Sequence, residues 1–413
     1  MVGHYSTEAL ASASFVNNVF NIAIFACIGF TYGLTPLLGA FFARGENNRI
    51  GSMLRIGVRI NVLFTLLITA LMAIGYFNLH RMGQPEELLP IIRPYYIIVL
   101  VSMIPVCLFN VFAQWSYAIN NTGYPTWIVL GANIVNVAGN YLLIYGHGGL
   151  PEMGLTGAGV STLLSRVLCF AAMAYVFFGT GLGKPYRNSF MKHQVEKGDS
   201  RLVAKTGFPV AMQMTFESSS FSGAAIMAGW LGAIELAAFQ IVAISGMLGF
   251  CLYYSIGAAL AIPVSHGAGY NDTAAMRNSA WAGYHIMLVC MSLAIILFMS
   301  CGHVIMGVFS NDEAVVGLAV TLLVPMALYQ LGDATQITFA NALRGTSHVM
   351  PMLYIAFFSY IVVGLPVTYL FAFPVGLGLY GIVLSFSVCL LMAAALFLTF
   401  FLRSTRKNST EKY

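Results

Sequence analysis

Long apolar runs alternate with short polar breaks along almost the whole chain. A helix needs about 20 apolar residues to cross the hydrocarbon core of a bilayer. The runs are long enough for this, and they lack the period-two alternation that is typical of membrane β-strands. The pattern therefore predicts an all-α polytopic membrane protein with eleven membrane-spanning helices. Their predicted limits are residues 10–42, 53–77, 91–119, 126–145, 157–179, 203–230, 235–263, 274–301, 314–343, 350–373 and 379–402.

A longer polar segment, residues 181–199, divides the chain into two halves that repeat each other. Residues 154–157 (GLTG) recur as residues 378–381 (GLYG), an offset of 224 positions. Two lobes of the same orientation imply a pseudo-twofold axis along the membrane normal and a central cleft, as in secondary transporters. The predicted domains are an N-terminal lobe of five helices (1–180), a cytoplasmic linker (181–201), a C-terminal lobe of six helices (202–402) and a cytoplasmic tail (403–413).

The composition fits a membrane protein, since 59% of the 413 residues are hydrophobic, 8% are charged and the mean hydropathy is +0.82. Soluble domains carry roughly 25% charged residues. Most basic residues gather on one predicted side of the membrane, which the positive-inside rule makes cytoplasmic. We therefore expect a multi-pass protein of the plasma membrane with a cytoplasmic C-terminus. The basic residues on this side are Arg44, Arg49, Arg55, Arg59, Lys184, Arg187, Lys192, Lys197, Arg201, Lys205, Arg277, Arg344, Arg403, Arg406, Lys407 and Lys412.

Motifs of enzyme chemistry are absent from the sequence. The seven cysteines stand singly in apolar runs, without the spacing of metal ligands. No GxSxG, HExxH or P-loop motif occurs. We expect a protein that is not an enzyme and has no cofactor or bound metal beyond a coupling Na⁺ or H⁺.

Asp333 is the single formal charge between Glu313 and Arg344, in the middle of a predicted span. Tyr329 lies four residues earlier, so the two side chains share a helix face. An ionised carboxylate in hydrocarbon is costly, and it is expected to face the protein interior or a water-filled cavity. Asp333 is either part of a transport site or a structural carboxylate paired with a neighbouring helix.

Glu217 is the second intramembrane acid, the one charge between Lys205 and Glu235. Both acids belong to the second half of the chain. Carboxylates gathered in one lobe favour a site for Na⁺, which prefers oxygen ligands, or for protons. We therefore predict a coupling site of Glu217, Tyr329 and Asp333.

Polar and flexible side chains near these acids are candidates for a substrate cavity. Gln213 precedes Glu217 by one turn, and Gln336 follows Asp333 by three residues. Met214 could line an adaptable hydrophobic surface or serve in ordinary packing. Gln240 is the fourth candidate.

The sequence resembles the multidrug and toxic compound extrusion (MATE) family over essentially its whole length, most closely the NorM-like branch. The similar segments are MVGHYSTEALASAS, GYPTWIVLGANIVNVAGNYLLIYG and GLTGAGVSTLLSR in the first half, and GFPVAMQMTFES, ELAAFQI and YQLGDATQ…ALRG in the second. In that branch the acid after the FPV segment and the Tyr and Asp of the YQ-x-x-D segment form the coupling-cation site. The resemblance carries this role to Glu217, Tyr329 and Asp333.

The resemblance implies a secondary antiporter, acting as a monomer in the lipid membrane, that exports small organic cations of amphiphilic character in exchange for Na⁺ or H⁺. The alternative is a flippase of a lipid-linked saccharide from the same wider superfamily. The family begins with a further helix that carries an Asp, and this sequence starts after it. We therefore expect twelve helices in a complete chain, with a start upstream of Met1 or a real truncation as the two explanations.

Overall fold

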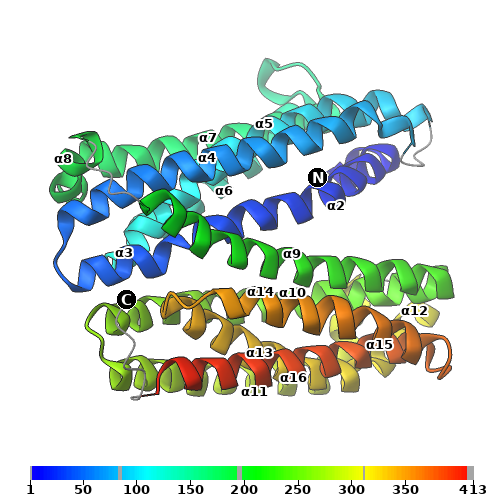
Figure 1. The fold of residues 1–413 in the computed structure, drawn as a ribbon. Coiled ribbons are helices and arrows are strands. Elements are labelled where there is room, and N and C mark those ends of the chain that lie inside the picture. The colour runs from blue at the N-terminus through cyan, green and yellow to red at the C-terminus, as the bar shows by residue number, and fades with distance from the viewer. Residues whose placement is uncertain (1, 82–85, 193–197, 310–311, 407–413) are drawn as a thin grey trace. The chain divides into compact units, whose positions relative to one another are not determined.

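The computed structural model describes residues 2–81, 86–192, 198–309 and 312–406, and all regular elements within these ranges are helices (Figure 1). This confirms the predicted all-α fold. The chain forms two compact units, Met1–Ala211 and Met212–Tyr413. The division falls inside the long helix α9 (Asp199–Leu231), which gives its first turns to unit 1 and the remainder to unit 2.

Unit 1 packs its helices around an aromatic core. The indole of Trp115 meets the ring of Phe177 edge to face at 4.9 Å between centroids, and that of Tyr186 at 5.8 Å. The elements of unit 1 before α9 are α1 (Val2–Tyr5), α2 (Thr7–Tyr32), α3 (Leu34–Ala43), α4 (Asn47–Phe77), η1 (Leu79–Arg81), η2 (Glu86–Leu88), α5 (Leu89–Ala118), α6 (Gly123–Tyr145), η3 (His147–Gly149), α7 (Gly154–Gly179), η4 (Gly181–Gly183) and α8 (Lys184–Lys192).

Unit 2 is built around α13, which packs against α10, α11 and α16 and is buried along most of its length. The elements of unit 2 after α9 are α10 (Ala233–Gly269), α11 (Thr273–Phe309), α12 (Glu313–Thr321), α13 (Leu323–Gly345), α14 (Met350–Ala356), the π-helix η5 (Phe357–Gly364), α15 (Leu365–Ala372) and α16 (Gly378–Ser404). A central helix that is buried and also polar needs partners for its side chains on the surrounding helices.

The internal repeat is visible in the backbone of the two units. Gly154 at the start of α7 has φ +54°, and Gly378 at the start of α16, 224 positions later, has φ +55°. A left-handed conformation at a helix start costs little only for glycine, which has no Cβ. Both halves of the chain therefore begin an equivalent helix with the same backbone geometry.

Nine helices in the described residues are long and apolar enough to span a membrane, or ten if a bent pair counts as one span. The predicted count of eleven is thus not confirmed. The difference lies in α9, which is 33 residues long but is not among the candidate spans. Its polar residues, Gln213, Glu217 and the serines that follow, lower its hydropathy.

The predicted single helix 314–343 is wrong in one respect, because α12 and α13 meet at a bend of 50°. The cause is Pro325 in the first turn of α13. Proline has no N–H to donate to the carbonyl of residue 321, and its ring crowds that carbonyl. Helix α12 accordingly ends at Thr321. The carbonyl oxygen of Pro325 accepts a bond from Ser387 Oγ at 3.3 Å.

The predicted linker contains helix α8, which is fastened to unit 1 beside α4 (Figure 1). Arg55 of α4 donates to the carbonyl oxygens of Phe190 and Met191 at the end of α8, at 3.0 and 2.6 Å. Arg187 of α8 donates to the carbonyl oxygen of Phe177 at 2.8 Å and to that of Thr180. The predicted linker residues 193–197 lie outside the described residues, as does the tail from 407.

The start of α9 is also held by unit 1. Arg49 pairs with Asp199 through two N–H···O bonds of 3.1 and 3.3 Å. Eight residues further on, or about two helical turns, Gly207 approaches the joint between α2 and α3 so closely that a Cβ on Gly33 would stand 2.5 Å from Gly207 Cα. Charge pairing and glycine contact together make the first turns of α9 an integral part of unit 1.

We expect Gly51→Ala to detach α8 from α4. A Cβ at position 51 would collide with Ser189 Oγ and the carbonyl oxygen of Tyr186. Overpacking of this kind costs about 1–3 kcal/mol. The apparent melting temperature in detergent should fall, and cleavage by trypsin within residues 181–201 should become faster. Gly131→Ala is the control, because a Cβ there meets nothing within 4 Å. Identical melting and cleavage of the two variants would contradict this packing.

Candidate functional site

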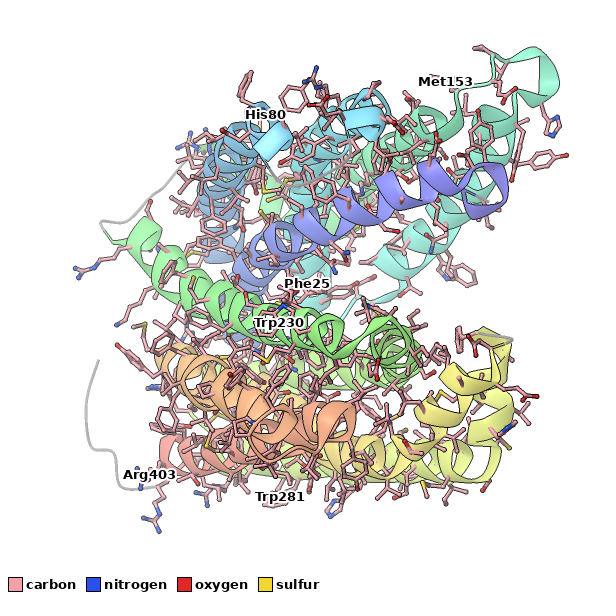
Figure 2. The ribbon with its side chains drawn as sticks, turned by 90° about the vertical axis from the view of Figure 1, so that its right-hand side faces the viewer. Phe25, His80, Met153, Trp230, Trp281 and Arg403 are labelled. Atoms are coloured by element: carbon pink, nitrogen blue, oxygen red, sulfur yellow. The ribbon has the colours of Figure 1, made fainter. Side chains whose placement is uncertain are left out.

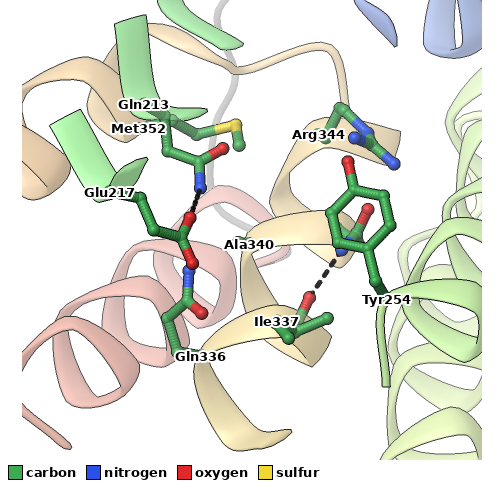
Figure 3. A pocket seen from close by; sticks show the side chains of 9 residues that line it. Gln213, Glu217, Tyr254, Gln336, Ile337, Ala340, Arg344 and Met352 are labelled. Carbon is green, nitrogen blue, oxygen red and sulfur yellow. Dashed lines mark hydrogen bonds between the residues drawn. The ribbon is translucent and has the colours of Figure 1, made fainter. Parts of the chain in front are cut away.

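A small pocket lies inside unit 2, among α9, α10, α13 and α14 (Figure 3). Its volume is about 10 Å³, which is room for about one water molecule or a bare ion. The lining residues are Gln213, Glu217, Tyr254, Gln336, Ile337, Ala340, Asn341, Arg344 and Met352. The pocket thus suits an ion or a proton and its water rather than a drug-sized compound.

Glu217 is the carboxylate of this pocket, and α9 brings Gln213 to it. The two residues are four apart on one helix, so their side chains share a face. Gln213 Nε2 donates to Glu217 Oε2 at 2.8 Å (Figure 3). Gln336 lies on the same side of the pocket, and Arg344 and Tyr254 lie on the other (Figure 3). The predicted residues Glu217, Gln213 and Gln336 therefore meet in the structure.

Asp333 and Tyr329 lie on α13, outside the lining of this pocket but close to it. Asp333 is 4% exposed and Tyr329 is 7% exposed. Asp333 lies three residues, or about one helical turn, before Gln336, which lines the pocket together with Glu217. In a medium of low dielectric constant, two like charges close to each other are stable only when a cation or a proton compensates them. Both predicted acids thus lie in unit 2, and their joint role as a coupling site stays a prediction.

Helix α10 approaches α13 closely because it presents glycines to the polar face of α13. The Tyr329 hydroxyl lies against Gly246. A Cβ at Gly249 would stand 2.8 Å from Gln330 Oε1, and a Cβ at Gly257 would stand 2.7 Å from Asn341 Nδ2. Small residues at a helix interface allow this approach in membranes. The spacing of these glycines was a signal in the sequence that could have identified α10 as the partner of α13.

Several buried polar atoms around the acids have no hydrogen-bond partner within the described residues. They are Tyr253 Oη, Tyr360 Oη, Gln330 Oε1 and Nε2, Gln336 Oε1 and Asn341 Oδ1. Buried polar groups are nearly always satisfied in proteins, by solvent or an ion where no protein atom serves. Most of these atoms are oxygens, the ligand type that Na⁺ and hydrated protons require. The donor set therefore fits the predicted coupling cation.

Tyr360 is a buried polar residue near Glu217 in the fold that the sequence reasoning missed. Its side chain is 1% exposed, and its hydroxyl has no hydrogen-bond partner within the described residues. It belongs to the π-helix η5, which packs on α9 on both sides of Glu217. Phe357 meets the ring of Phe216 at 5.5 Å, and a Cβ at Gly364 would stand 3.5 Å from Ser220 Oγ. π-Helical turns often occur at functional sites, but no pattern in the sequence predicted this one.

The remaining predicted residues have other positions. Met214 does not line the pocket, but its sulfur lies 3.8 Å from the Tyr254 hydroxyl. Gln240 is exposed and lies outside the lining, so its role in a substrate cavity stays a prediction. In the described part of the chain no cluster of three His, Cys, Asp or Glu side chains suits a metal ion. A cation here would depend on two carboxylates and on neutral oxygens.

Polar groups in the spans of unit 1 have a different chemistry from those of unit 2. Arg166 Nη1 donates to Ser102 Oγ at 2.6 Å, and Tyr95 Oη donates to Asn17 Oδ1 at 3.2 Å. Ser161 Oγ donates to the carbonyl oxygen of Asn136 at 2.8 Å. The units therefore share a backbone plan but not a charge pattern.

Apolar helices of membrane length around a buried acidic site define the class of polytopic membrane transporters.

Comparison with known proteins places the chain within this class. The profile of the MatE family matches residues 1–142 and 209–370, well over half of the chain. The chain belongs to the MatE family of multidrug and toxic compound extrusion proteins, so it is a membrane transporter and not an enzyme. This confirms the resemblance found in the sequence.

Two curated relatives are named probable multidrug resistance protein NorM. The one from Bradyrhizobium diazoefficiens is 29% identical over 392 residues, which cover 94% of this chain and 84% of the relative. The one from Geobacillus kaustophilus is 28% identical over 405 residues, which cover 98% of this chain and 89% of the relative. The similarity therefore extends over nearly the whole length of these proteins.

Solved structures show the same fold at low sequence identity. A MATE protein in complex with MaL6 superposes with a TM-score of 0.87 at 17% identity, covering 98% of this chain and 90% of the other. The eukaryotic MATE transporter AtDTX14 gives 0.87 at 16% identity, covering 98% and 91%. A MOP superfamily transporter from Pyrococcus furiosus gives 0.88 at 17% identity, covering 98% and 89%.

We expect Gly246→Ala to disturb the site through Tyr329. The added methyl group would collide with the Tyr329 hydroxyl, whereas the ring carbon Cζ lies 3.2 Å away. Gly246→Ala should therefore lower the melting temperature in detergent, and Tyr329→Phe in the same chain should restore most of the loss. Gly317→Ala serves as the control, since nothing lies within 4 Å of its Cβ position. A double variant as unstable as Gly246→Ala alone would refute the contact.

Proposed function

We propose that this transporter exports cationic, amphiphilic organic compounds in exchange for Na⁺ or H⁺, with Glu217 and Asp333 holding the coupling cation. The observation that carries the proposal is the presence of two carboxylates within the apolar helices of unit 2, the buried Asp333 and the half-buried Glu217, which lines the small pocket. The names of the curated relatives, which point to multidrug resistance, support the direction and the cargo.

The free energy of burial explains why these acids suit coupling. A carboxylate removed from water costs several kcal/mol unless it is compensated. When a cation or proton leaves the two acids, their negative charge must be compensated in another way. Another positive partner can bind, water can enter, or the conformation can change. A cationic cargo is such a partner, so one negatively charged site can alternate between coupling cation and cargo.

The pocket beside Glu217 is consistent with a site for the coupling cation rather than for the cargo. Its volume is about 10 Å³, whereas pockets for organic ligands measure roughly 300–1,000 Å³. Tyr329, Tyr360 and the amide of Gln330 supply neutral oxygens near the acids. We propose further that the protein acts as a monomer in the plasma membrane, with its C-terminus in the cytoplasm.

We expect Asp333→Asn to abolish gradient-driven export, and Glu217→Gln to do the same. Each change removes one of the two charges that bind the cation. Export of a fluorescent organic cation should be measured in proteoliposomes under a Na⁺ gradient at equal pH and under a pH gradient without Na⁺. Tyr329→Phe should keep partial activity, since it removes one neutral oxygen and no charge. The control is Glu87→Gln, an exposed acid of unit 1.

The two gradients also identify the coupling ion. Export by the wild type under the Na⁺ gradient alone assigns Na⁺, and export under the pH gradient alone assigns H⁺. Wild-type rates from both Asp333→Asn and Glu217→Gln would eliminate these acids as the coupling site. The variants must first elute from size-exclusion chromatography as the wild type does.

We expect Tyr360→Phe to weaken the coupling cation without destabilising the fold. The hydroxyl has no hydrogen-bond partner in the described residues, so its loss should leave the melting temperature unchanged or raise it slightly. The cation concentration for half-maximal export should rise about three- to tenfold, as for the loss of one neutral ligand. Tyr369→Phe, an exposed tyrosine of α15, is the matched control. An unchanged half-maximal concentration would exclude Tyr360 from the site.

A further inference from the structure

A second cavity of unit 2 shares no lining residue with the pocket beside Glu217 and lies on the exposed side of α14 and α16. Its volume is about 370 Å³, and its accessible surface is apolar. The lining residues are Met350, Pro351, Tyr354, Ile355, Phe358, Leu396 and Phe400. Tyr354 is 63% exposed and Phe358 is 48% exposed. We call this cavity the α14–α16 groove. It is open and of the size of a site for an organic ligand.

One end of the α14–α16 groove carries a positive charge. Leu396, Phe400 and Arg403 lie four and three residues apart on α16, so they share one face of the helix. The Arg403 guanidinium carbon is 6.0 Å from the centroid of the Phe400 ring. Arg403 is exposed and lies at the outer edge of its unit (Figure 2). The groove therefore combines an apolar floor with a cation at its rim.

Two buried or capping arginines near this end of unit 2 have different tasks, whereas Arg406 is exposed like Arg403. Arg277 donates to Thr405 Oγ1 at 2.9 Å and to the Leu402 carbonyl oxygen at 3.1 Å, which caps α16. Arg344 is buried and lines the acidic pocket. Arg403 stands outside these arrangements and can meet a ligand from the membrane interface.

The charge of the rim selects among membrane amphiphiles. A cationic amphiphile would be repelled by Arg403, and a phosphatidylcholine would present its phosphate together with a positive choline. An anionic phospholipid offers an acyl chain for the groove and an unneutralised phosphate for the guanidinium, which pairs well with phosphate oxygens. Basic residues near the membrane surface attract anionic lipid by about 1 kcal/mol each.

We propose that the α14–α16 groove binds one anionic phospholipid, with an acyl chain along Tyr354, Phe358 and Phe400 and the phosphate on Arg403. Phe358 belongs to the π-helix that also carries Tyr360. The lipid therefore rests on the segment that packs against α9 beside Glu217. Binding of this lipid does not require the proposed cargo or the proposed coupling ion.

The proposal is tested on the purified full chain by native mass spectrometry. The protein is delipidated in detergent and titrated with phosphatidylglycerol or phosphatidylcholine of the same acyl chains. The wild type should retain one phosphatidylglycerol in preference to phosphatidylcholine. Arg403→Gln should weaken this binding about fivefold and leave phosphatidylcholine binding unchanged. Leu396→Trp, which fills the groove, should weaken binding of both lipids.

Two matched controls separate the groove from the general lipid surface. Arg93→Gln removes an exposed arginine of unit 1, and Leu293→Trp enlarges an exposed apolar residue of α11. Both should bind phosphatidylglycerol as the wild type does. Equal retention of the two lipids by the wild type, or a loss in the controls as large as in Arg403→Gln, would overturn the proposal. Since Arg403 is exposed, the folding of its variant is checked simply by an unchanged melting temperature without lipid.

Discussion

Keeping Asp333 out of water costs free energy that the rest of unit 2 has to offset. The effective penalty is several kcal/mol for each buried ion, which is a large part of the stability of an ordinary domain. Unit 2 has a polar helix, α13, at its centre, and neutral hydrogen-bond donors offset part of this cost. One of them is the Gln213 amide, 2.8 Å from Glu217. Residues of α9 and α10 meet α13 around the small pocket.

The glycines of α10 show how closely α10 packs against α13. At Gly246, Gly249 and Gly257 a single methyl group would meet Tyr329, Gln330 and Asn341. These glycines do not serve unusual backbone angles, because they lie within a regular helix. Without side chains, they leave room on α10 for the polar side chains of α13. The same residues therefore determine both the packing of the two helices and the positions of the polar groups.

Much of the fold could be predicted from sequence because membranes impose a simple rule on it. Apolar runs of sufficient length become helices, and an acid within such a run, as at Asp333, is conspicuous. Tyr253, Gln330 and Tyr360 were not conspicuous, because neutral polar residues are common in membrane helices and their role depends on which helices meet. Pro325 was a local signal for the bend at Leu322 that the predicted single helix 314–343 did not use. The π-helix and the docking of α8 depend on tertiary contacts that no local pattern encodes.

The π-helix has a consequence for the comparison of related sequences. A π-turn accommodates one residue more than an α-turn over the same rise, and each residue of an α-helix turns the chain by about 100°. A relative that lacks one residue between Phe357 and Gly364 would form a plain α-helix here, with the turns on both sides kept in phase and the side chains inside the segment moved to other positions. Ser359 or Ile361 would then stand where Tyr360 stands here. A one-residue gap in this segment therefore marks a different site chemistry, even where the aligned letters agree.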